Sequence, residues 1–309
     1  MPDSTTATTT TTPAPHTSHP PLDVTAYLRR IGWSGAPRPD VATLRAVQTA
    51  HLLAVPFENL DALRGIAPSL ALADLTGKLL DRPRGGYCYE HNTLFAAVLE
   101  AIGFRVTRLA ARVVVGAVSW NSRPRTHMAL LVEVPGEPEP YLADVGFGSI
   151  GALPTAVPLV PETEFRAGSR CHRLVRAPHP GPLPLWVLQA RHPGAGPGGA
   201  AGDWEAQYVF TLEPFEPADF EVINWHIATN PRSPFTSALH VQRTLTAEHR
   251  SLAGRQFRVT RADGTVTERE LPDETEARRV LAEEFGIIAP DGMVLLGGRP
   301  TTELPPAGD

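Results

Sequence analysis

Cysteine, lysine and long apolar runs are scarce in this sequence of 309 residues. Its two cysteines, Cys88 and Cys171, cannot form a disulfide framework. No run of about 18 uncharged apolar residues occurs, which argues against a transmembrane helix. The N-terminus also lacks the basic and apolar regions of a secretory signal. Acidic residues outnumber basic ones by 33 to 28, so a protein that neutralises nucleic-acid phosphates is disfavoured. We expect a cytoplasmic protein with no nucleic-acid or membrane partner.

Apolar residues are nevertheless plentiful, because hydrophobic side chains make up 42% of the chain. This content supports a sizeable core, and the length predicts two domains or at most three. Residues 1–22 are rich in Thr and Pro, which predicts a disordered tail in which His16 and His19 are solvated. The Gly- and Pro-rich residues 293–309 predict a second flexible tail, and 192–203 predict a flexible loop.

The hydrophobic period changes twice between the tails. Residues 23–104 carry four segments with apolar residues at helical spacing, which predicts a helical bundle. Residues 105–216 hold six or seven short β-rich segments, which predict a sandwich or a barrel. Residues 217–292 mix both patterns and predict an α/β segment. The expected fold class is therefore α+β with several domains.

The densest group of reactive side chains surrounds Cys88, in the stretch 84–92. This stretch ends a Pro/Gly loop and opens a predicted helix. The positive end of a helix dipole favours the thiolate, which is the nucleophilic form of cysteine. Gly85 and Gly86 would let the backbone approach a substrate closely. A lone free cysteine is usually a small buried residue, so a catalytic assignment requires partners.

His127 and Asp144 provide such partners. His127 opens an apolar strand 39 residues after Cys88, and Asp144 ends the next strand 17 residues later. A short hairpin would bring the two side chains within hydrogen-bond reach. A thiolate nucleophile needs a base, and the base needs an orienting carboxylate. Taken singly, each residue fits a structural role, but the order Cys–His–Asp predicts a catalytic triad.

With these motifs the sequence resembles the arylamine N-acetyltransferase family. The resemblance runs collinearly over residues 23–290. Its blocks are residues 55–60, 84–92, 126–128, 143–148, 224–225 and 229–235. A Gly-Gly-x-Cys motif alone is weak evidence, whereas several ordered blocks are strong evidence.

The resemblance implies a fold and a reaction. The fold is a helical bundle (23–104), a β-barrel-like domain (105–216) and an α/β lid (217–292), with a triad like that of cysteine proteases. Acetyl-CoA is implied as co-substrate: Cys88 takes its acetyl group, His127 assists proton transfer and Asp144 fixes the histidine. An aromatic amine or hydrazine then accepts the acetyl group, which gives ping-pong kinetics. No metal is expected, since Cys171 and His172 lack further ligands at fitting spacing.

Other residues of the matching blocks have less certain roles. The candidates for substrate binding are Phe57, Tyr89, Thr126 and Phe147, although core packing explains the aromatic ones equally well. The resemblance implies that Thr229, Arg232 and Ser233 face coenzyme A. Family members often carry small hydroxyl residues where this chain has Arg232 and Pro234, and Arg232 can pair with a phosphate. Structural hydrogen bonding is expected from Glu58 and Asn59, and bracing of the cysteine loop from Arg84 and Glu90.

Three alternative functions remain open on the sequence. A related amide synthase would keep the triad and close a macrolactam from an aryl-amine polyketide chain on an acyl carrier protein. A transglutaminase-like or papain-like cysteine hydrolase shares the same Cys–His–Asp/Asn logic. A non-catalytic binding module would have an unreactive Cys88. The sequence is compatible with a monomer or a homodimer.

Overall fold

The computed structural model describes residues 22–191 and 202–297. The predicted tail at 1–22, with His16 and His19, lies almost wholly outside these ranges. The same holds for most of the predicted loop at 192–203 and of the tail at 293–309. Within the described residues, no helix is long and apolar enough to cross a membrane.

Helices dominate the first third of the chain and return near its end. The helices are α1 (Val24–Arg30), α2 (Val41–Ala54), α3 (Leu60–Leu63), α4 (Leu72–Leu79), α5 (Cys88–Ile102), α6 (Pro217–Thr229), α7 (Pro234–Ser237) and α8 (Glu274–Val280), with a 3₁₀ turn at Trp120–Ser122 and a π-helical turn at Leu281–Phe285. Capping residues explain two of the boundaries. Asp23 accepts a hydrogen bond from the Ala26 amide at the start of α1, and Gly103 ends α5 with a left-handed φ of 110°.

The middle of the chain forms an eight-stranded antiparallel sheet. Its strands are β2 (Arg105–Val113), β3 (His127–Glu133), β4 (Tyr141–Ala143), β5 (Val157–Pro158), β6 (Glu164–Ala167), β7 (Arg170–Ala177), β8 (Leu185–Arg191) and β9 (Glu205–Pro214), in the order β5-β4-β3-β2-β9-β8-β7-β6. The two edge strands, β5 and β6, follow one another in the chain, and a bridge from Pro161 to Leu174 of β7 nearly closes the sheet. The sequence did not indicate β5 and β6, since they are too short to show an alternating pattern.

A second sheet of five strands collects residues from both ends of the chain. Its strands are β1 (Phe57–Glu58), β10 (His240–Thr244), β11 (Glu248–Ala253), β12 (Gln256–Arg261) and β13 (Val266–Glu270), in that order. The pairing of β1 with β10 therefore crosses between the ranges 23–104 and 217–292. Every residue of the edge strand β13 is exposed, so it lacks the half-buried pattern from which strands are predicted.

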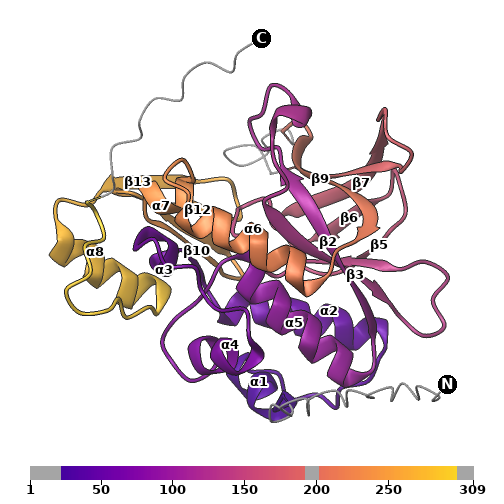
Figure 1. The fold of residues 1–309 in the computed structure, drawn as a ribbon, viewed down its shortest axis with the longest axis horizontal. Coiled ribbons are helices and arrows are strands. Elements are labelled where there is room, and N and C mark those ends of the chain that lie inside the picture. The colour runs from indigo at the N-terminus through magenta and orange to yellow at the C-terminus, as the bar shows by residue number, and fades with distance from the viewer. Residues whose placement is uncertain (1–21, 192–201, 298–309) are drawn as a thin grey trace, which may run out of the picture.

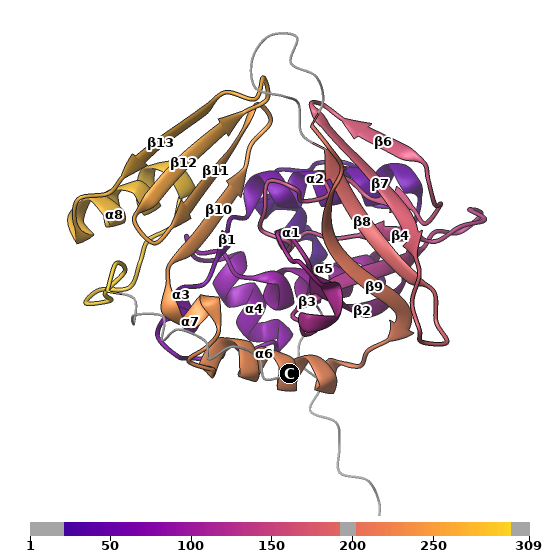
Figure 2. The same ribbon diagram turned by 90° about the horizontal axis from the view of Figure 1, so that it is seen from above.

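The helices of the first third lie between the two sheets. Figure 2 shows the five-stranded sheet on one side of α1, α2, α4 and α5, and the eight-stranded sheet on the other. Helix α6 crosses in front of this helical layer in Figure 1. The largest buried apolar cluster joins α5 to α2, α4 and β3, and it includes Cys88 and Met128. The start of α5 is thus held inside the molecule and beside the beginning of β3.

Candidate active site

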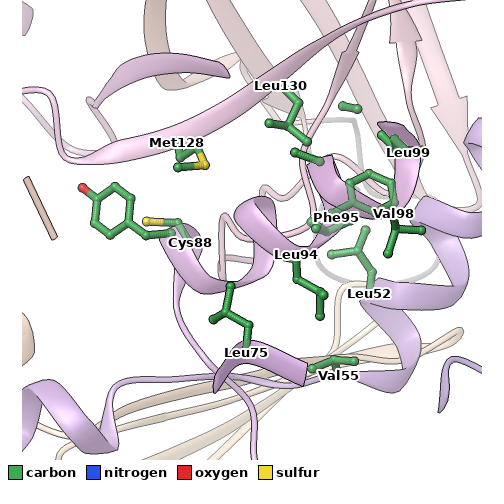
Figure 3. Packing of buried hydrophobic residues seen from close by; sticks show 14 of the residues in the cluster. Leu52, Val55, Leu75, Cys88, Leu94, Phe95, Val98, Leu99, Met128 and Leu130 are labelled. Carbon is green, nitrogen blue, oxygen red and sulfur yellow. The ribbon is translucent and has the colours of Figure 1, made fainter. Parts of the chain in front are cut away.

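Cys88 is the first residue of α5, as the sequence predicted. The preceding residue, Tyr87, has extended backbone, and its amide donates to the Glu90 carboxylate at 3.1 Å. The Cys88 side chain is buried, and its Sγ lies 3.8 Å from the carbonyl oxygen of Thr126, just before β3. Figure 3 shows Cys88 at the start of its helix with Met128 across from it. The thiol therefore faces the first residues of β3 and the positive end of α5.

Two glycines allow the loop before Cys88 to pack closely, although for a different reason from the one inferred above. A Cβ atom on Gly85 would lie 1.9 Å from the Pro56 carbonyl oxygen, and one on Gly86 would lie 2.8 Å from the Glu90 carboxylate. The Gly86 carbonyl also accepts the Glu58 amide at 2.8 Å. The close approach in this structure is thus to the protein itself, and it fixes the cysteine loop against β1.

His127 and Asp144 meet as the hairpin predicted. Strands β3 and β4 pair antiparallel, with Leu130 opposite Ala143, so the side chains at the start of β3 and just after β4 converge. His127 Nε2 lies 2.7 Å from Asp144 Oδ2, and both side chains are buried. The hydrogen bond to Asp144 occupies Nε2 of the ring, which leaves Nδ1 available to Cys88.

The charges of this pair stabilise each other. Burial alone would lower the pKa of His127, but the Asp144 carboxylate and a hydrogen bond with Cys88 raise it to about 10. Burial likewise raises the pKa of Asp144, but the His127 charge and hydrogen bonds from Asn92 and Gly146 hold it below its usual value. At neutral pH the pair is therefore an imidazolium and a carboxylate.

Asn92 and Gly146 hold the three groups in place. Asn92 Nδ2 donates to the Met128 carbonyl at 2.7 Å and to Asp144 Oδ1 at 2.9 Å, and its Oδ1 accepts the Val145 amide. A Cβ atom on Gly146 would lie only 2.6 Å from the Cys88 Cα. Asn92 was assigned no role from the sequence, although its position one helical turn after Cys88 places it on the same face of α5.

A buried ionic cluster braces the loop from the other side. Lys78 Nζ lies 2.5 Å from Asp61 and 2.6 Å from Glu90, while Arg84 Nε lies 2.7 Å from Glu58. Burial lowers the pKa of Lys78, but the surrounding carboxylates, Glu90 first, outweigh it and raise the pKa above its ordinary value. Asn59 adds a further link, because its amide donates to the carbonyl of Phe235 within α7 and to that of Ala238 just after it. These contacts agree with the structural hydrogen bonds expected of Glu58 and Asn59 and with the bracing of the cysteine loop expected of Arg84 and Glu90.

The predicted substrate-binding residues all lie near the triad but on different sides of it. The Phe147 ring lies 5.2 Å from the His127 ring, and the Thr126 carbonyl faces Cys88. Phe57 and Tyr89 are buried in the apolar cluster that contains Cys88, whereas Phe147 belongs to the cluster inside the eight-stranded sheet. The Tyr89 hydroxyl is buried beside Cys88, and burial, followed by the Cys88 sulfur, raises its pKa.

The predicted coenzyme A residues lie at the end of α6 and the start of α7. The Thr229 hydroxyl donates to the Trp225 carbonyl, and Ser233 Oγ accepts the Phe235 amide. Arg232 is exposed. Thr229 also borders a cavity of about 430 Å³ whose wall includes Arg64. The segment reaches the cysteine loop through the Phe235 ring, which packs 6.0 Å from the Tyr87 ring.

Three further residues around the site were assigned no role from the sequence. The Tyr208 ring, from β9, lies 5.0 Å from the His127 ring, and burial and then Asp144 raise the pKa of its hydroxyl. His51 and His91 form a buried hydrogen-bonded pair behind the cysteine loop. His91 lies in the stretch 84–92, but its pairing with His51, like the contact of Tyr208 with His127, arises only through tertiary packing. In the part of the chain that the structure describes, no group of three or more His, Cys, Asp or Glu residues is arranged to hold a metal.

Known proteins share the sequence pattern of this chain. The sequence model of a family described as N-acetyltransferase matches residues 40–291. The chain is 40% identical over 246 residues to the arylamine N-acetyltransferase of Mycolicibacterium smegmatis, covering 79% of this chain and 84% of the relative. It is 38% identical over 277 residues to the arylamine N-acetyltransferase of Mycobacterium tuberculosis, covering 87% and 91%.

Solved structures give the same picture. The arylamine N-acetyltransferase of Nocardia farcinica superposes with a TM-score of 0.78 at 40% identity, over 87% of this chain and 90% of the other. The Mycobacterium marinum arylamine N-acetyltransferase in complex with CoA superposes with a TM-score of 0.77 at 35% identity, over 86% and 93%. The fold therefore agrees with that of these enzymes over most of both chains.

Proposed function

Since this chain belongs to the arylamine N-acetyltransferase family, we propose that it moves an acetyl group from acetyl-CoA to an aromatic amine or hydrazine. The transfer passes through an acetyl-cysteine at Cys88. Dividing the reaction in this way replaces the direct attack of a weakly nucleophilic amine on a thioester by two easier steps. Coenzyme A leaves before the amine reacts, so the kinetics are ping-pong.

In the first step the Cys88 sulfur attacks the carbonyl carbon of the thioester. A new carbon–sulfur bond forms at Cys88, the bond to coenzyme A breaks, and the departing thiolate takes a proton from His127. His127 is suited to this role because Asp144 keeps it protonated at neutral pH. Asp144 fixes the ring through Nε2, and Nδ1 carries the transferred proton.

In the second step the amine nitrogen attacks the acetyl-cysteine carbonyl. The neutral His127 takes the proton that the amine loses, and Cys88 departs as the thiolate. This restores the starting pair of thiolate and imidazolium. The candidates for contacting the aromatic ring are Phe57, Tyr89, Thr126 and Phe147, while Thr229, Arg232 and Ser233 are the candidates for contacting coenzyme A.

One observation carries the proposal: Cys88 starts a helix beside a histidine that a buried carboxylate holds in its charged form. The direct test mixes the protein with acetyl-CoA, without acceptor, and measures the intact mass. We expect a gain of one acetyl group that is absent in Cys88→Ala and retained in Cys171→Ala. An adduct that persists in Cys88→Ala would exclude Cys88 as the nucleophile. Side reactions at amines are limited, because Lys78 is the sole lysine and is held in ion pairs.

The amide synthase is the second candidate. The observation that favours it is that the hydroxyls of Thr229 and Ser233 bond within their own segment, while Arg232 and Pro234 replace residues often found in the family. Such an enzyme would take an aryl-amine chain from an acyl carrier protein. A folded protein whose Cys88 reacts with an alkylating probe but gains no acetyl group from acetyl-CoA would place this function first.

A further inference from the structure

A pocket lies where hairpin turns of the two sheets meet. It is enclosed by the β6–β7 turn at Ser169 and Arg170, by the β10–β11 turn (245–248) and by the β12–β13 turn (261–264). Figure 2 shows these ends of the two sheets converging at the top of the view. The pocket, which we name the turn pocket, has a volume of about 300 Å³, at the lower end of the range for small-molecule sites.

Positive charge exceeds negative charge on the wall of the turn pocket. Its charged residues are Arg170, Glu248, Arg258 and Arg261. Glu248 is already neutralised by Arg250, and Arg258 by Glu268. Arg170 and Arg261 make no ion pair with any carboxylate of the described residues. The wall also carries hydroxyl groups, among them Ser169 and Thr246.

Arg170 is the unusual member of this set. Its guanidinium forms no hydrogen bond with any described residue, and its Nη1 atom is completely buried. Burial lowers the pKa of this group, and no carboxylate of the described residues opposes the effect. An unpaired buried charge destabilises a protein unless a partner offsets the desolvation penalty. The turn pocket offers space for such a partner, and no group of residues 22–191 or 202–297 fills that role.

The same arginine also borders an apolar cavity. A second space of about 240 Å³ shares Ser169 and Arg170 with the turn pocket. Its other walls include Leu52 and Leu53 of α2 and Pro154. Arg170 therefore borders two neighbouring spaces whose linings are both mostly apolar. A ligand that fills both must join an anionic group to a flat or apolar body.

We propose that the turn pocket binds a nucleoside phosphate, with Arg170 and Arg261 pairing with the phosphate and the base entering the cavity beside Leu52 and Leu53. Arginine suits this role because its planar fork of donors matches phosphate oxygens and stays charged. The ligand can come from two sources: the phosphorylated adenosine end of acetyl-CoA, or a free nucleotide that binds apart from the reaction. The first source rests on the proposed function, whereas the nucleotide site itself does not.

The loop between the pocket and the reaction centre is short. Ile150 lines the turn pocket, and three residues earlier Phe147 packs against the His127 ring. A nucleotide bound near Ile150 is thus linked by one loop to the histidine. If the nucleotide belongs to acetyl-CoA, this pocket and not the segment at Thr229–Ser233 would hold its phosphates.

The binding test uses adenosine 3′,5′-bisphosphate and isothermal titration with the full chain. We expect wild type to bind it, Arg170→Gln to bind at least tenfold more weakly, and Arg166→Gln to bind like wild type. Arg166 is the matched control, because it lies on the same hairpin and pairs with Glu164 outside the pocket. The melting temperature of Arg170→Gln without ligand should equal or exceed that of wild type, since an unpaired charge is removed. Equal binding by wild type and Arg170→Gln would overturn the proposal, as would inorganic phosphate binding as tightly as the nucleotide.

A kinetic comparison then separates the two sources. If the nucleotide is that of the acyl donor, Arg170→Gln raises KM for acetyl-CoA but leaves acylation by p-nitrophenyl acetate, which has no nucleotide, unchanged. If the nucleotide is free, KM for acetyl-CoA is unchanged while bisphosphate binding is lost. Acylation of Cys88 by p-nitrophenyl acetate tests the proposed acetyl-cysteine chemistry without involving the turn pocket. A failure of the nucleotide site therefore does not count against the proposed function, and a failure of the proposed function does not count against the nucleotide site.

Discussion

The Nε2 atom of His51 lies 2.7 Å from the Nδ1 atom of His91, and both rings are completely buried. The contacts around them fix the direction of every hydrogen bond. His91 Nε2 faces the carbonyls of Gly86 and Pro56, so it must carry the proton. His91 Nδ1 therefore accepts from His51 Nε2, and His51 Nδ1 accepts from the Tyr27 hydroxyl at 2.7 Å. This series of hydrogen bonds runs from Tyr27 to the loop that carries Cys88, and it requires both histidines to be neutral.

These hydrogen bonds predict that the free energy of unfolding decreases in mild acid. Burial lowers the pKa of His91 to about 4 and that of His51 well below its usual value. In the unfolded protein both histidines bind protons near pH 6.5. The stability that the folded state gains by keeping them neutral is therefore complete above that pH and is lost as the pH falls toward 4. His91 alone accounts for about 3 kcal/mol. Urea unfolding at several pH values between 7.5 and 4.5 measures the slope of the free energy of unfolding against pH.

The control for this slope is a solvent-exposed histidine of the same protein. Substitution His179→Gln changes an exposed side chain and should leave the slope unchanged. Substitution His91→Gln should flatten it, because a glutamine amide can still donate to the carbonyls but does not titrate. An equal slope in His91→Gln and wild type would show that the acid sensitivity lies elsewhere.

Asp144→Asn should slow acylation of Cys88 by roughly 10²- to 10⁴-fold. Without the carboxylate, only Cys88 still opposes the effect of burial, so the pKa of His127 falls from about 10. His127 then carries its proton in fewer molecules, and it is held less firmly in place to give that proton to the leaving thiolate. Stopped-flow acylation measures the rate, and the NMR titration of His127 measures the shift. Asp263→Asn, in an exposed turn, is the control, and an unchanged rate in Asp144→Asn would exclude Asp144 as the orienting group.

Asn92→Ala should weaken both stability and rate. The change removes three buried hydrogen bonds, to Met128, Asp144 and Val145, which costs about 2–4 kcal/mol of unfolding free energy. The Asp144 carboxylate then loses one of its donors and the loop after β4 is released from α5. We expect acylation to slow by about tenfold or more. Urea unfolding measures the effect on stability, and stopped-flow acylation measures the effect on rate. The control is Asn121→Ala, which changes an exposed side chain. Normal acylation in Asn92→Ala would show that Asn92 only supports the fold.

The close approach of Cys88, His127 and Asp144 could be predicted because local signals carry it. Cys88 follows a Gly-Gly loop at the start of an amphipathic helix, and His127 and Asp144 lie at the same end of one hairpin, at the start of β3 and just after β4. Each signal spans fewer than twenty residues, a range in which helix and hairpin geometry determine which side chains meet. The helices α1, α2, α4 and α5 were predicted for the same reason, since their apolar spacing is local.

The residues that escaped prediction meet only in the folded chain. Tyr208 reaches His127 because β9 pairs with β2 in the middle of the eight-stranded sheet, and nothing in the sequence around it marks this. Strand β1 has two residues and exists because β10, almost two hundred residues later, pairs with it. The close packing of Gly85 on Pro56 depends on that same pairing of distant segments, so the reason for the glycine was not readable from the motif.

Gly146→Ala tests how closely the loop after Asp144 must approach the nucleophile. The added methyl group would lie 2.6 Å from the Cys88 Cα and 2.9 Å from the Asn92 amide nitrogen, both held by surrounding structure. The loop must therefore move away from α5 and carry Asp144 with it, which lengthens its contact with His127. A displacement of this kind slows a positioned reaction by roughly 10²-fold, so acylation should fall by about that factor while the protein still folds.

Gly77→Ala is the matched control for this substitution. Gly77 lies within α4, and a methyl group there meets nothing within 4 Å. Because alanine favours a helix over glycine by up to about 1 kcal/mol, this variant should be slightly more stable than wild type and fully active. Stopped-flow acylation and thermal unfolding of both variants give the comparison. If Cys88 is acylated as fast in Gly146→Ala as in Gly77→Ala, then the contact between this loop and Cys88 does not set the geometry of the reaction. Asp144 could then orient His127 from a loop position other than the one seen here.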